Sequence, residues 1–289
     1  MSSPFIYDPA RNYEVRVYDV EYRRNQGKPW EARIYQPQGN GPFPALLFVH
    51  GGAWNTGSRT SGELINHSLA TSGLVVVAID FRIAPEHPYP AQVVDVNYAT
   101  RWLKAHATEF NSDASNIGGL GSSSGGHTIM LSAMRPHDSR YTAISSPEVE
   151  GHDATFAYLL ETWPVLDPYA RYIHAKKADM DRLVTSTEAY FLNEEAMHEG
   201  NPQVILENKE KVELPPTLII QGTADKNVPM SIPDRFVEAY RSAGGEIELE
   251  IFPDMPHMFG SDPGTETDRS LRLMKAFVAG QLARSATPV

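Results

Sequence analysis

The order of apolar and polar residues along the chain predicts strands alternating with helices. Residues 14–22 and 30–36 alternate apolar and polar side chains, as half-buried edge strands do. The runs PALLFV at 44–49 and LVVVAID at 74–80 are continuously apolar, which is typical of central strands buried on both faces. A helix is expected between these two runs, over residues 61–72.

The same alternation continues to the C-terminal end of the sequence. A Pro-rich turn at 85–90 precedes a predicted helix over 91–109, and GSSSGG connects a short strand at 116–120 to a helix over 124–135. Further strands are predicted at 154–161, 216–221 and 247–252, and further helices at 231–243 and 265–284. This order predicts an α/β fold, in which helices cover both faces of a mostly parallel sheet.

One long stretch departs from the alternation. Residues 163–210 contain no strand pattern, many charged residues and scattered aromatic residues. We interpret this stretch as a helical insertion that lies over the carboxyl ends of the strands as a lid or cap. An ordinary crossover with an enlarged surface loop is the alternative.

Length, charge and composition restrict the class of protein. The 289 residues suit a single α/β domain over 1–289, and a net charge of −11 disfavours nucleic acid and anionic membranes as partners. The absence of cysteine excludes disulfides and thiol catalysis. No apolar run approaches the roughly 18 residues of a membrane span, and the first residues do not resemble a secretory signal, so a cytoplasmic protein is expected.

A candidate nucleophile lies at the junction of a predicted strand and helix. Gly121-Ser122-Ser123-Ser124-Gly125 fits G-x-S-x-G, in which a tight turn raises the central hydroxyl clear of the sheet and glycines let the neighbouring elements approach. A plain Ser/Gly-rich loop is one alternative. A nucleotide-binding loop at Gly119, Gly121 and Gly125 is another, but the acidic residue that should follow is only Asp138, which lies in a turn.

Three further loops each follow a predicted strand. His50-Gly51-Gly52-Ala53-Trp54 could place the amides of Gly52 and Ala53, together with that of Ser124, around a developing oxyanion. We expect His50 to fix this loop by hydrogen bonds rather than to act as a base. Asp225 follows the strand at 216–221 and His257 follows that at 247–252, so nucleophile, acid and base occur in the chain order of α/β-type serine hydrolases.

The remaining histidines suggest no other chemistry. His127 lies in the helix after GSSSGG, where a packed or hydrogen-bonded role is expected. The ten histidines form neither an H-x-x-x-H nor an H-E-x-x-H pair, so no metal is predicted.

Together these motifs resemble the hormone-sensitive-lipase-like branch of α/β-hydrolase esterases. HGGAW, DFRIAPEHPYPA at 80–91, GSSSGG, GTADKNVP and PHMF carry the resemblance from about residue 30 onward. It implies an eight-stranded α/β-hydrolase fold, the triad Ser123, Asp225 and His257, an oxyanion hole framed by Gly51, Gly52 and Ser124, and no cofactor. The elbow departs from the Gly-Asp-Ser-Ala-Gly of that branch, and GSSSGGH is more similar to feruloyl-esterase-like and arylformamidase-like relatives.

The sequence therefore predicts a serine carboxylesterase that cleaves small uncharged carboxylic esters, as a monomer or a homodimer. An amidase, arylformamidase or lactonase with the same triad remains open, and a non-catalytic ligand-binding protein on the same scaffold is a more remote alternative. Large apolar groups are expected to form one wall of a substrate pocket beside Ser123; they are Trp54, Trp163, Tyr190, Phe191, Met255, Met258 and Phe259.

Overall fold

The computed structural model describes residues 7–25 and 27–285, and within them eight strands form one sheet. The strands are β1 (Val15–Asn25), β2 (Lys28–Pro37), β3 (Phe43–Val49), β4 (Val75–Ile79), β5 (Ser112–Ser122), β6 (Leu159–Thr162), β7 (Thr217–Gly222) and β8 (Ile247–Phe252). They are ordered β1-β2-β4-β3-β5-β6-β7-β8. The sheet is parallel from β4 to β8, whereas β2 pairs antiparallel with both β1 and β4. This arrangement confirms the predicted mostly parallel, eight-stranded α/β sheet.

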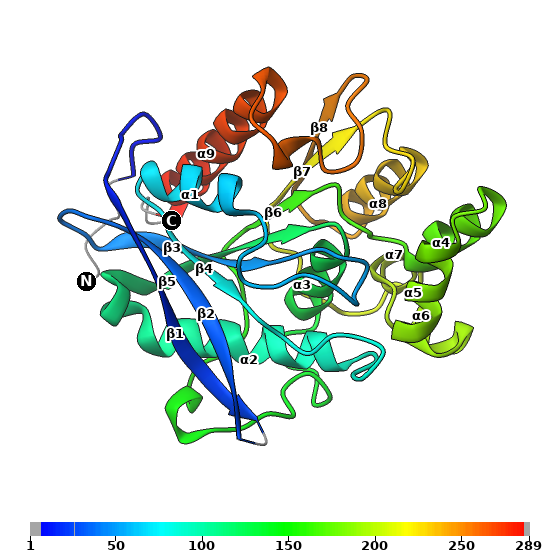
Figure 1. Ribbon diagram of the computed structural model, residues 1–289, viewed down its shortest axis with the longest axis horizontal. Coiled ribbons are helices and arrows are strands. Elements are labelled where there is room, and N and C mark those ends of the chain that lie inside the picture. The colour runs from blue at the N-terminus through cyan, green and yellow to red at the C-terminus, as the bar shows by residue number, and fades with distance from the viewer. Residues whose placement is uncertain (1–6, 26, 286–289) are drawn as a thin grey trace.

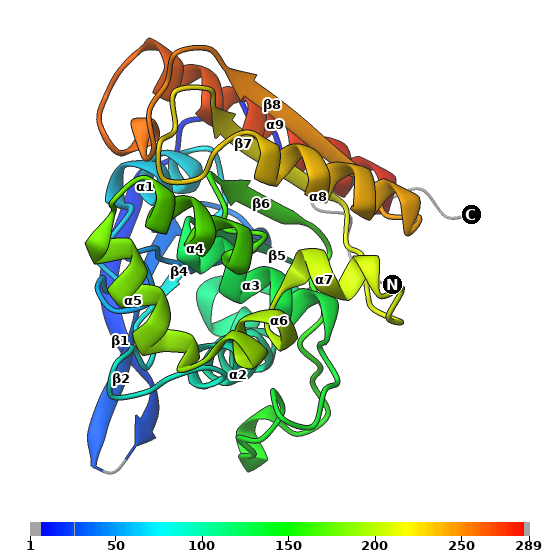
Figure 2. The same cartoon turned by 90° about the vertical axis from the view of Figure 1, so that its right-hand side faces the viewer.

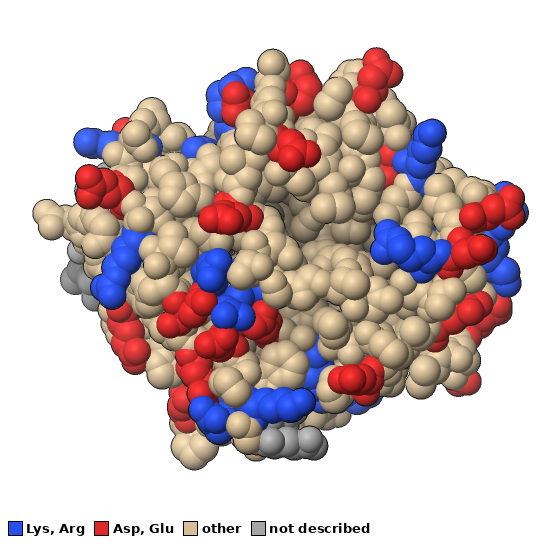
Figure 3. Space-filling view, viewed as in Figure 1, with Lys and Arg blue, Asp and Glu red and all other residues tan. Residues whose placement is uncertain are grey.

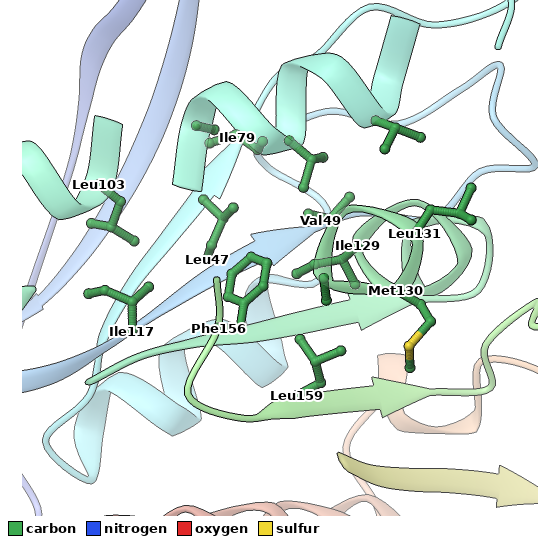
Figure 4. Close-up of a cluster of buried hydrophobic side chains, with 14 of the residues drawn as sticks. Leu47, Val49, Ile79, Leu103, Ile117, Ile129, Met130, Leu131, Phe156 and Leu159 are labelled. Carbon is green, nitrogen blue, oxygen red and sulfur yellow. The ribbon is translucent and has the colours of Figure 1, made fainter. Parts of the chain in front are cut away.

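Helices cover both faces of the sheet (Figure 1). The apolar residues of α1 (Glu63–Thr71) and α9 (Thr265–Ser285) pack with those of the strands on one face. Those of α2 (Ala91–His106), α3 (Ser124–Met134) and α8 (Ser231–Ser242) pack on the other. Short 3-10 helices occupy Ala107–Phe110, Pro147–Val149 and Phe259–Ser261. Figure 4 shows Ile129 and Met130 of α3 close to Leu47, Phe156 and Leu159 beneath them, so the helix that follows the elbow rests on the centre of the core.

The strand predictions differ from the structure in three places. Residues 30–36 were expected at an edge, but β2 lies inside the sheet between β1 and β4, and β1 is the edge strand. The strand predicted at 116–120 extends over Ser112–Ser122, because its polar first half still pairs with β3 at Phe43. The run at 154–161 forms a strand only over Leu159–Thr162, and Phe156 packs into the core from an irregular segment.

The stretch between β6 and β7 is helical, as predicted. It contains α4 (Pro168–Lys177), α5 (Asp181–Phe191), α6 (Glu194–Glu199) and α7 (Pro202–Glu207). Asn or Asp side chains cap three of these helices, at Asp167, Asn193 and Asn201, which explains why so short a stretch divides into separate helices. Figures 1 and 2 show these helices beyond the carboxyl ends of β5 and β6. Their role as a lid or cap stays a prediction.

The elbow requires an unusually close approach between β3 and α3. Val49 of β3 lies opposite Gly121 of β5, so the loops that leave these two strands are neighbours. A Cβ atom on Gly125 would lie 2.2 Å from the carbonyl oxygen of Val49 and 2.4 Å from that of His50. Both atoms belong to the backbone, so they could not move aside without distorting the loop.

Gly125→Ala is therefore expected to destabilise the fold by at least about 2 kcal/mol, as overpacking at a rigid site does. Gly280→Ala is the matched control, because a Cβ atom there, in the exposed last turns of α9, meets nothing within 4 Å. The control should leave stability unchanged or raise it by up to about 1 kcal/mol, since alanine favours helix more than glycine does. Chemical denaturation of both variants measures the difference, and equal stabilities would contradict the close approach.

Candidate active site

Ser123 lies at a strained turn between β5 and α3. Its backbone dihedrals are φ 54° and ψ −118°, a region that side-chain-bearing residues rarely adopt. The turn is held from both sides: the Ser123 amide donates to the carbonyl of Thr162 at 2.9 Å, and the Ser123 carbonyl accepts from the amide of Val165 at 3.1 Å. These bonds to the end of β6 hold the serine in the conformation expected of a nucleophile elbow.

His257 and Asp225 reach Ser123 from two other strand ends. Asp225 lies in the loop after β7 and His257 in the loop after β8. The Ser123 Oγ lies 3.0 Å from His257 Nε2, and His257 Nδ1 lies 2.7 Å from Asp225 Oδ2. Because the carboxylate accepts a hydrogen bond from Nδ1–H, Nε2 is left free to accept the serine proton. The predicted serine, histidine and aspartate are thus brought together.

The carboxylate of Asp225 is buried and fully hydrogen-bonded. Its side chain is 1% exposed. Oδ1 accepts from the amides of Asn227 and Val228, both at 2.8 Å, while Oδ2 accepts from the Gln221 side-chain amide at 3.0 Å as well as from His257. Donors on every side fix the direction in which Oδ2 faces.

The loop after β3 folds tightly against the elbow. A Cβ atom on Gly51 would lie 3.0 Å from the Cβ of Ser123. Gly52 has φ 122°, and a Cβ atom there would lie 2.2 Å from the carbonyl oxygen of Thr56. A side chain at Gly51 would push the loop away from the serine, and one at Gly52 would open the turn of the loop itself, which accounts for the paired glycines.

Backbone amides are available beside the elbow. Within the described part of the chain, the amides of Gly52 and Ala53 donate no hydrogen bond. Ser124 is the first residue of α3, so its amide has no acceptor inside the helix. The Ser124 hydroxyl accepts from the Trp54 amide at 3.2 Å and thereby joins this loop to the elbow.

His50 and His127 are buried away from the serine–histidine contact. The His50 ring stacks on Phe81 at 4.2 Å between centroids, and its Nδ1 lies 2.7 Å from the Gly51 carbonyl oxygen. His127 accepts from the Trp54 indole at Nδ1 and faces the Gly200 carbonyl at Nε2. Burial lowers the pKa of each ring to about 4. Both are therefore neutral, and their contacts agree with the expected structural roles.

The large apolar residues predicted for the pocket do not form one wall. Trp54, Tyr190 and Phe191 belong to one cluster, in which Tyr190 stacks on Trp54 at 5.0 Å and Phe191 meets it edge-on at 5.3 Å. Each of these side chains is at most 1% exposed. Tyr190 and Phe191 are thus core residues that attach the insertion to the loop after β3, and their placement in an open pocket was wrong.

The remaining predicted pocket residues lie elsewhere. Trp163 is 6.3 Å from the His257 ring and 5.2 Å from that of Phe259, and its indole donates to the Ser122 hydroxyl at 3.0 Å. Met255 and Phe259 are partly buried against the cluster on the α1–α9 face, whereas Met258 is 52% exposed. Figure 3 shows a hollow over the ends of β5 and β6, surrounded mainly by uncharged residues.

Several buried ionisable residues escaped the sequence analysis, and two of them lie close to the site. Arg171 of α4 is 1% exposed, although the many charged residues around it in the sequence are typical of a surface segment. Glu161 of β6 is fully buried, and neither carboxyl oxygen has a hydrogen-bond partner in the described part of the chain. Its Oε2 fills the space left by two glycines of the elbow: a Cβ atom would lie 2.3 Å from it on Gly126 and 2.8 Å from it on Gly121. Burial raises its pKa well above the ordinary value.

Among residues 7–25 and 27–285, no group of three or more His, Cys, Asp or Glu side chains could hold a metal ion. No helix in the same ranges has the length and apolar character needed to cross a bilayer.

The sheet order and the Ser123–His257–Asp225 line define an α/β-hydrolase. The chain belongs to the BD-FAE family, whose model matches residues 33–239. The resemblance to hormone-sensitive-lipase-like esterases is also confirmed. Esterase LipC of Mycobacterium tuberculosis is 31% identical over 252 residues, or 84% of this chain and 60% of LipC. The probable carboxylic ester hydrolase LipM of the same organism is 30% identical over 226 residues, 76% of this chain and 50% of LipM. The chain thus spans only half to three-fifths of the length of these relatives.

Solved structures agree with the fold. Esterase B of Lactobacillus rhamnosis superimposes with a TM-score of 0.79 at 17% identity, covering 96% of this chain and 91% of its own. Esterase 2 of Thermogutta terrifontis, in a form phosphoramylated by tabun, gives a TM-score of 0.71 at 25% identity, with 91% of this chain and 94% of its own covered.

The buried Glu161 gives a pH-dependent stability that can be measured. Because its pKa is raised in the folded state, the unfolded chain releases this proton at lower pH than the folded one. Its stabilising contribution is complete below about pH 4.3 and is lost as pH rises toward the folded pKa. Glu161→Gln keeps the shape of the side chain but has no proton to lose. Its melting temperature should therefore increase relative to that of wild type as the pH increases from 5 to 8.

Glu238→Gln, at an exposed position of α8, is the control and should follow wild type at every pH. A melting-temperature difference between Glu161→Gln and wild type that stays constant with pH would contradict the burial of a protonated Glu161.

Proposed function

We propose that this chain is a serine carboxylesterase that hydrolyses small uncharged carboxylic esters through an acyl-enzyme on Ser123. The observation that carries the proposal is the hydrogen-bonded line from the strained serine through His257 to Asp225, with distances of 3.0 and 2.7 Å. The names of the relatives LipC, an esterase, and LipM, a probable carboxylic ester hydrolase, support the same class of reaction.

In the first half of the reaction, the Ser123 Oγ forms a bond to the ester carbonyl carbon while its proton passes to His257 Nε2. The imidazolium is stabilised by the buried carboxylate of Asp225. The tetrahedral intermediate then collapses, the bond to the alkoxy oxygen breaks, and the alcohol leaves with the proton that His257 returns.

The negative charge of the intermediate needs donors that are already in place. The amides of Gly52, Ala53 and Ser124 are unpaired and lie in the two loops that meet at the elbow, so we assign them to the oxyanion hole, with Gly51 providing the space. In the second half, a water molecule loses a proton to His257 and attacks the acyl carbon. The bond between that carbon and Ser123 Oγ then breaks, the acid leaves, and His257 returns the proton to Oγ.

The preference for small, uncharged substrates is supported by the uncharged surroundings of the hollow in Figure 3. Phe259 is partly exposed beside the buried Trp163, whose ring lies 6.3 Å from that of His257, and we propose Phe259 as the apolar contact for the acyl or alcohol group. The insertion at 163–210 acts as a cap in this proposal. A cytoplasmic location and a homodimer stay predictions.

Ser123→Ala should lower kcat by roughly 10⁴–10⁶, because removal of a triad nucleophile costs about that much elsewhere. Ser122→Ala is the matched control: its hydroxyl accepts from the Trp163 indole, whereas His257 pairs with Ser123, so activity should fall far less. A fluorophosphonate probe should label wild type and Ser122→Ala but not Ser123→Ala. Labelling that persists in Ser123→Ala would move the nucleophile elsewhere.

The class of substrate is tested by the same variants on p-nitrophenyl esters, anilides and lactones of matched acyl groups. Faster turnover of anilides or lactones than of esters would replace the carboxylesterase with an amidase or lactonase. Probe labelling without turnover of any of them would favour a binding protein on this scaffold.

A neutral His257 is required as the base, so kcat/KM should rise as the pH increases from acidic toward neutral. Asp225→Asn should preserve the fold but lower kcat by roughly 10⁴, because an amide at this position allows the wrong histidine tautomer. Asp254→Asn, in the exposed turn before His257, is the control and should retain near-wild-type rates. A rate that does not change between pH 5 and pH 8 would rule out a histidine base.

A further inference from the structure

The insertion buries a positive charge without a matching carboxylate. Arg171 of α4 is 1% exposed, and no Asp or Glu oxygen of the described residues lies within ion-pair distance of it. Its Nε has no hydrogen-bond partner in that part of the chain. Burial lowers the pKa of the guanidinium to about 10, so it is still charged at neutral pH. A buried lone charge is unfavourable unless another charge compensates it.

The direct partners of Arg171 are all neutral. Nη1 donates to the side-chain oxygen of Asn227 at 3.1 Å, and Nη2 donates to the Thr187 hydroxyl at 3.2 Å. The guanidinium carbon lies 4.9 Å from the centroid of the Trp54 ring. These contacts come from α5 and from two loops of the site, the one after β3 and the one after β7. Arg171 therefore links the insertion to both loops.

Asn227 continues the line to the catalytic carboxylate. Its side-chain oxygen accepts from Arg171 while its backbone amide donates to Asp225 Oδ1 at 2.8 Å. The buried cation and the buried anion are therefore joined through one residue. The charged or titratable groups around this line include Arg182 of α5, which disfavours the charge of Arg171, and the neutral rings of His127 and Tyr190. They also include His174 of α4, whose Nε2 lies 2.8 Å from the carbonyl oxygen of Lys226 in the loop after β7.

We infer that Arg171 is a positioning residue: it is the buried counter-charge of Asp225, and through Asn227 it holds the loop after β7 so that the carboxylate faces His257. The inference rests on the proposed esterase function, since it assigns the insertion a part in ordering the triad. It also explains why a cation lies inside a cluster of aromatic and aliphatic residues, where a methionine of similar length would pack without cost.

The sign of the expected effect follows from the charge. A cation near the Asp225–His257 pair disfavours the imidazolium, so its removal makes protonation of His257 easier. The acid limb of the pH profile is the range in which kcat/KM rises with pH. Arg171→Met should shift this limb to higher pH by about 0.5 unit or more. It should also lower kcat by roughly 10- to 100-fold with KM nearly unchanged, because a loosened acid loop misplaces the base.

Arg171→Lys keeps the charge but not the forked contacts, so it should restore the acid limb while recovering only part of kcat. Lys177→Met is the matched control, because it removes an exposed cation of α4 that does not contact Asn227. It should change neither kcat nor the acid limb. A purely structural role for Arg171 would lower stability and kcat without moving the acid limb.

The deciding experiment measures steady-state profiles together with NMR titration of the His257 imidazole, which needs no turnover. We expect the midpoint of that titration to rise in Arg171→Met and to stay unchanged in Lys177→Met. An unchanged midpoint with kcat within about twofold of wild type would overturn the inference. If the wild-type protein hydrolyses no ester but Arg171→Met still shifts the midpoint, the proposed function is refuted. The pairing of Arg171 with Asp225 is then still supported.

If Arg171→Met does not fold, Asn227→Ala decides, because it breaks the line while it leaves both charges in place. Its kcat should fall roughly 10-fold at unchanged KM. Wild-type kinetics in Asn227→Ala would refute the inference.

Discussion

The site depends on a close contact between the backbone at the end of β3 and the backbone of the first turn of α3. The contact is possible because Gly125 has no side chain to meet the carbonyl oxygens of Val49 and His50. It places the unpaired amides of one loop beside the strained serine of the other. The strain at Ser123 is sustained by hydrogen bonds to Thr162 and Val165, so the neighbouring strand β6 takes part in holding the nucleophile.

The parallel order of β3, β5, β6, β7 and β8 brings the other groups to the same edge. Ser123 and His257 are 134 residues apart in the sequence, yet each lies just beyond the carboxyl end of its strand. The carboxyl ends of parallel strands lie along one edge, which is why a few loop residues after strands suffice to build a site. The strands β1 and β2 lie at the opposite side of the sheet from β7 and β8, and neither precedes a loop that carries Ser123, Asp225 or His257.

The sequence was sufficient to predict the fold and the positions of Ser123, Asp225 and His257, because strand periodicity and short motifs at strand ends are local properties. It was insufficient for Tyr190 and Phe191. Whether an aromatic residue of a polar helix faces a substrate or Trp54 depends on the packing of segments more than a hundred residues apart. Glu161 and Arg171 were missed for the same reason: a charged residue in sequence is normally at the surface, and only tertiary structure reveals that these two are enclosed.

The hydrogen bonds of His127 fix the proton on one particular nitrogen of its ring. Nδ1 must accept because the Trp54 indole can only donate, and Nε2 must donate because the Gly200 carbonyl can only accept. His257 has the opposite arrangement, with its hydrogen on Nδ1 toward Asp225. The folded protein therefore holds hydrogens on opposite ring nitrogens of two histidines close to one elbow, and the distinct ¹⁵N resonances of these rings would report separately on the insertion contact and on the triad in a single spectrum.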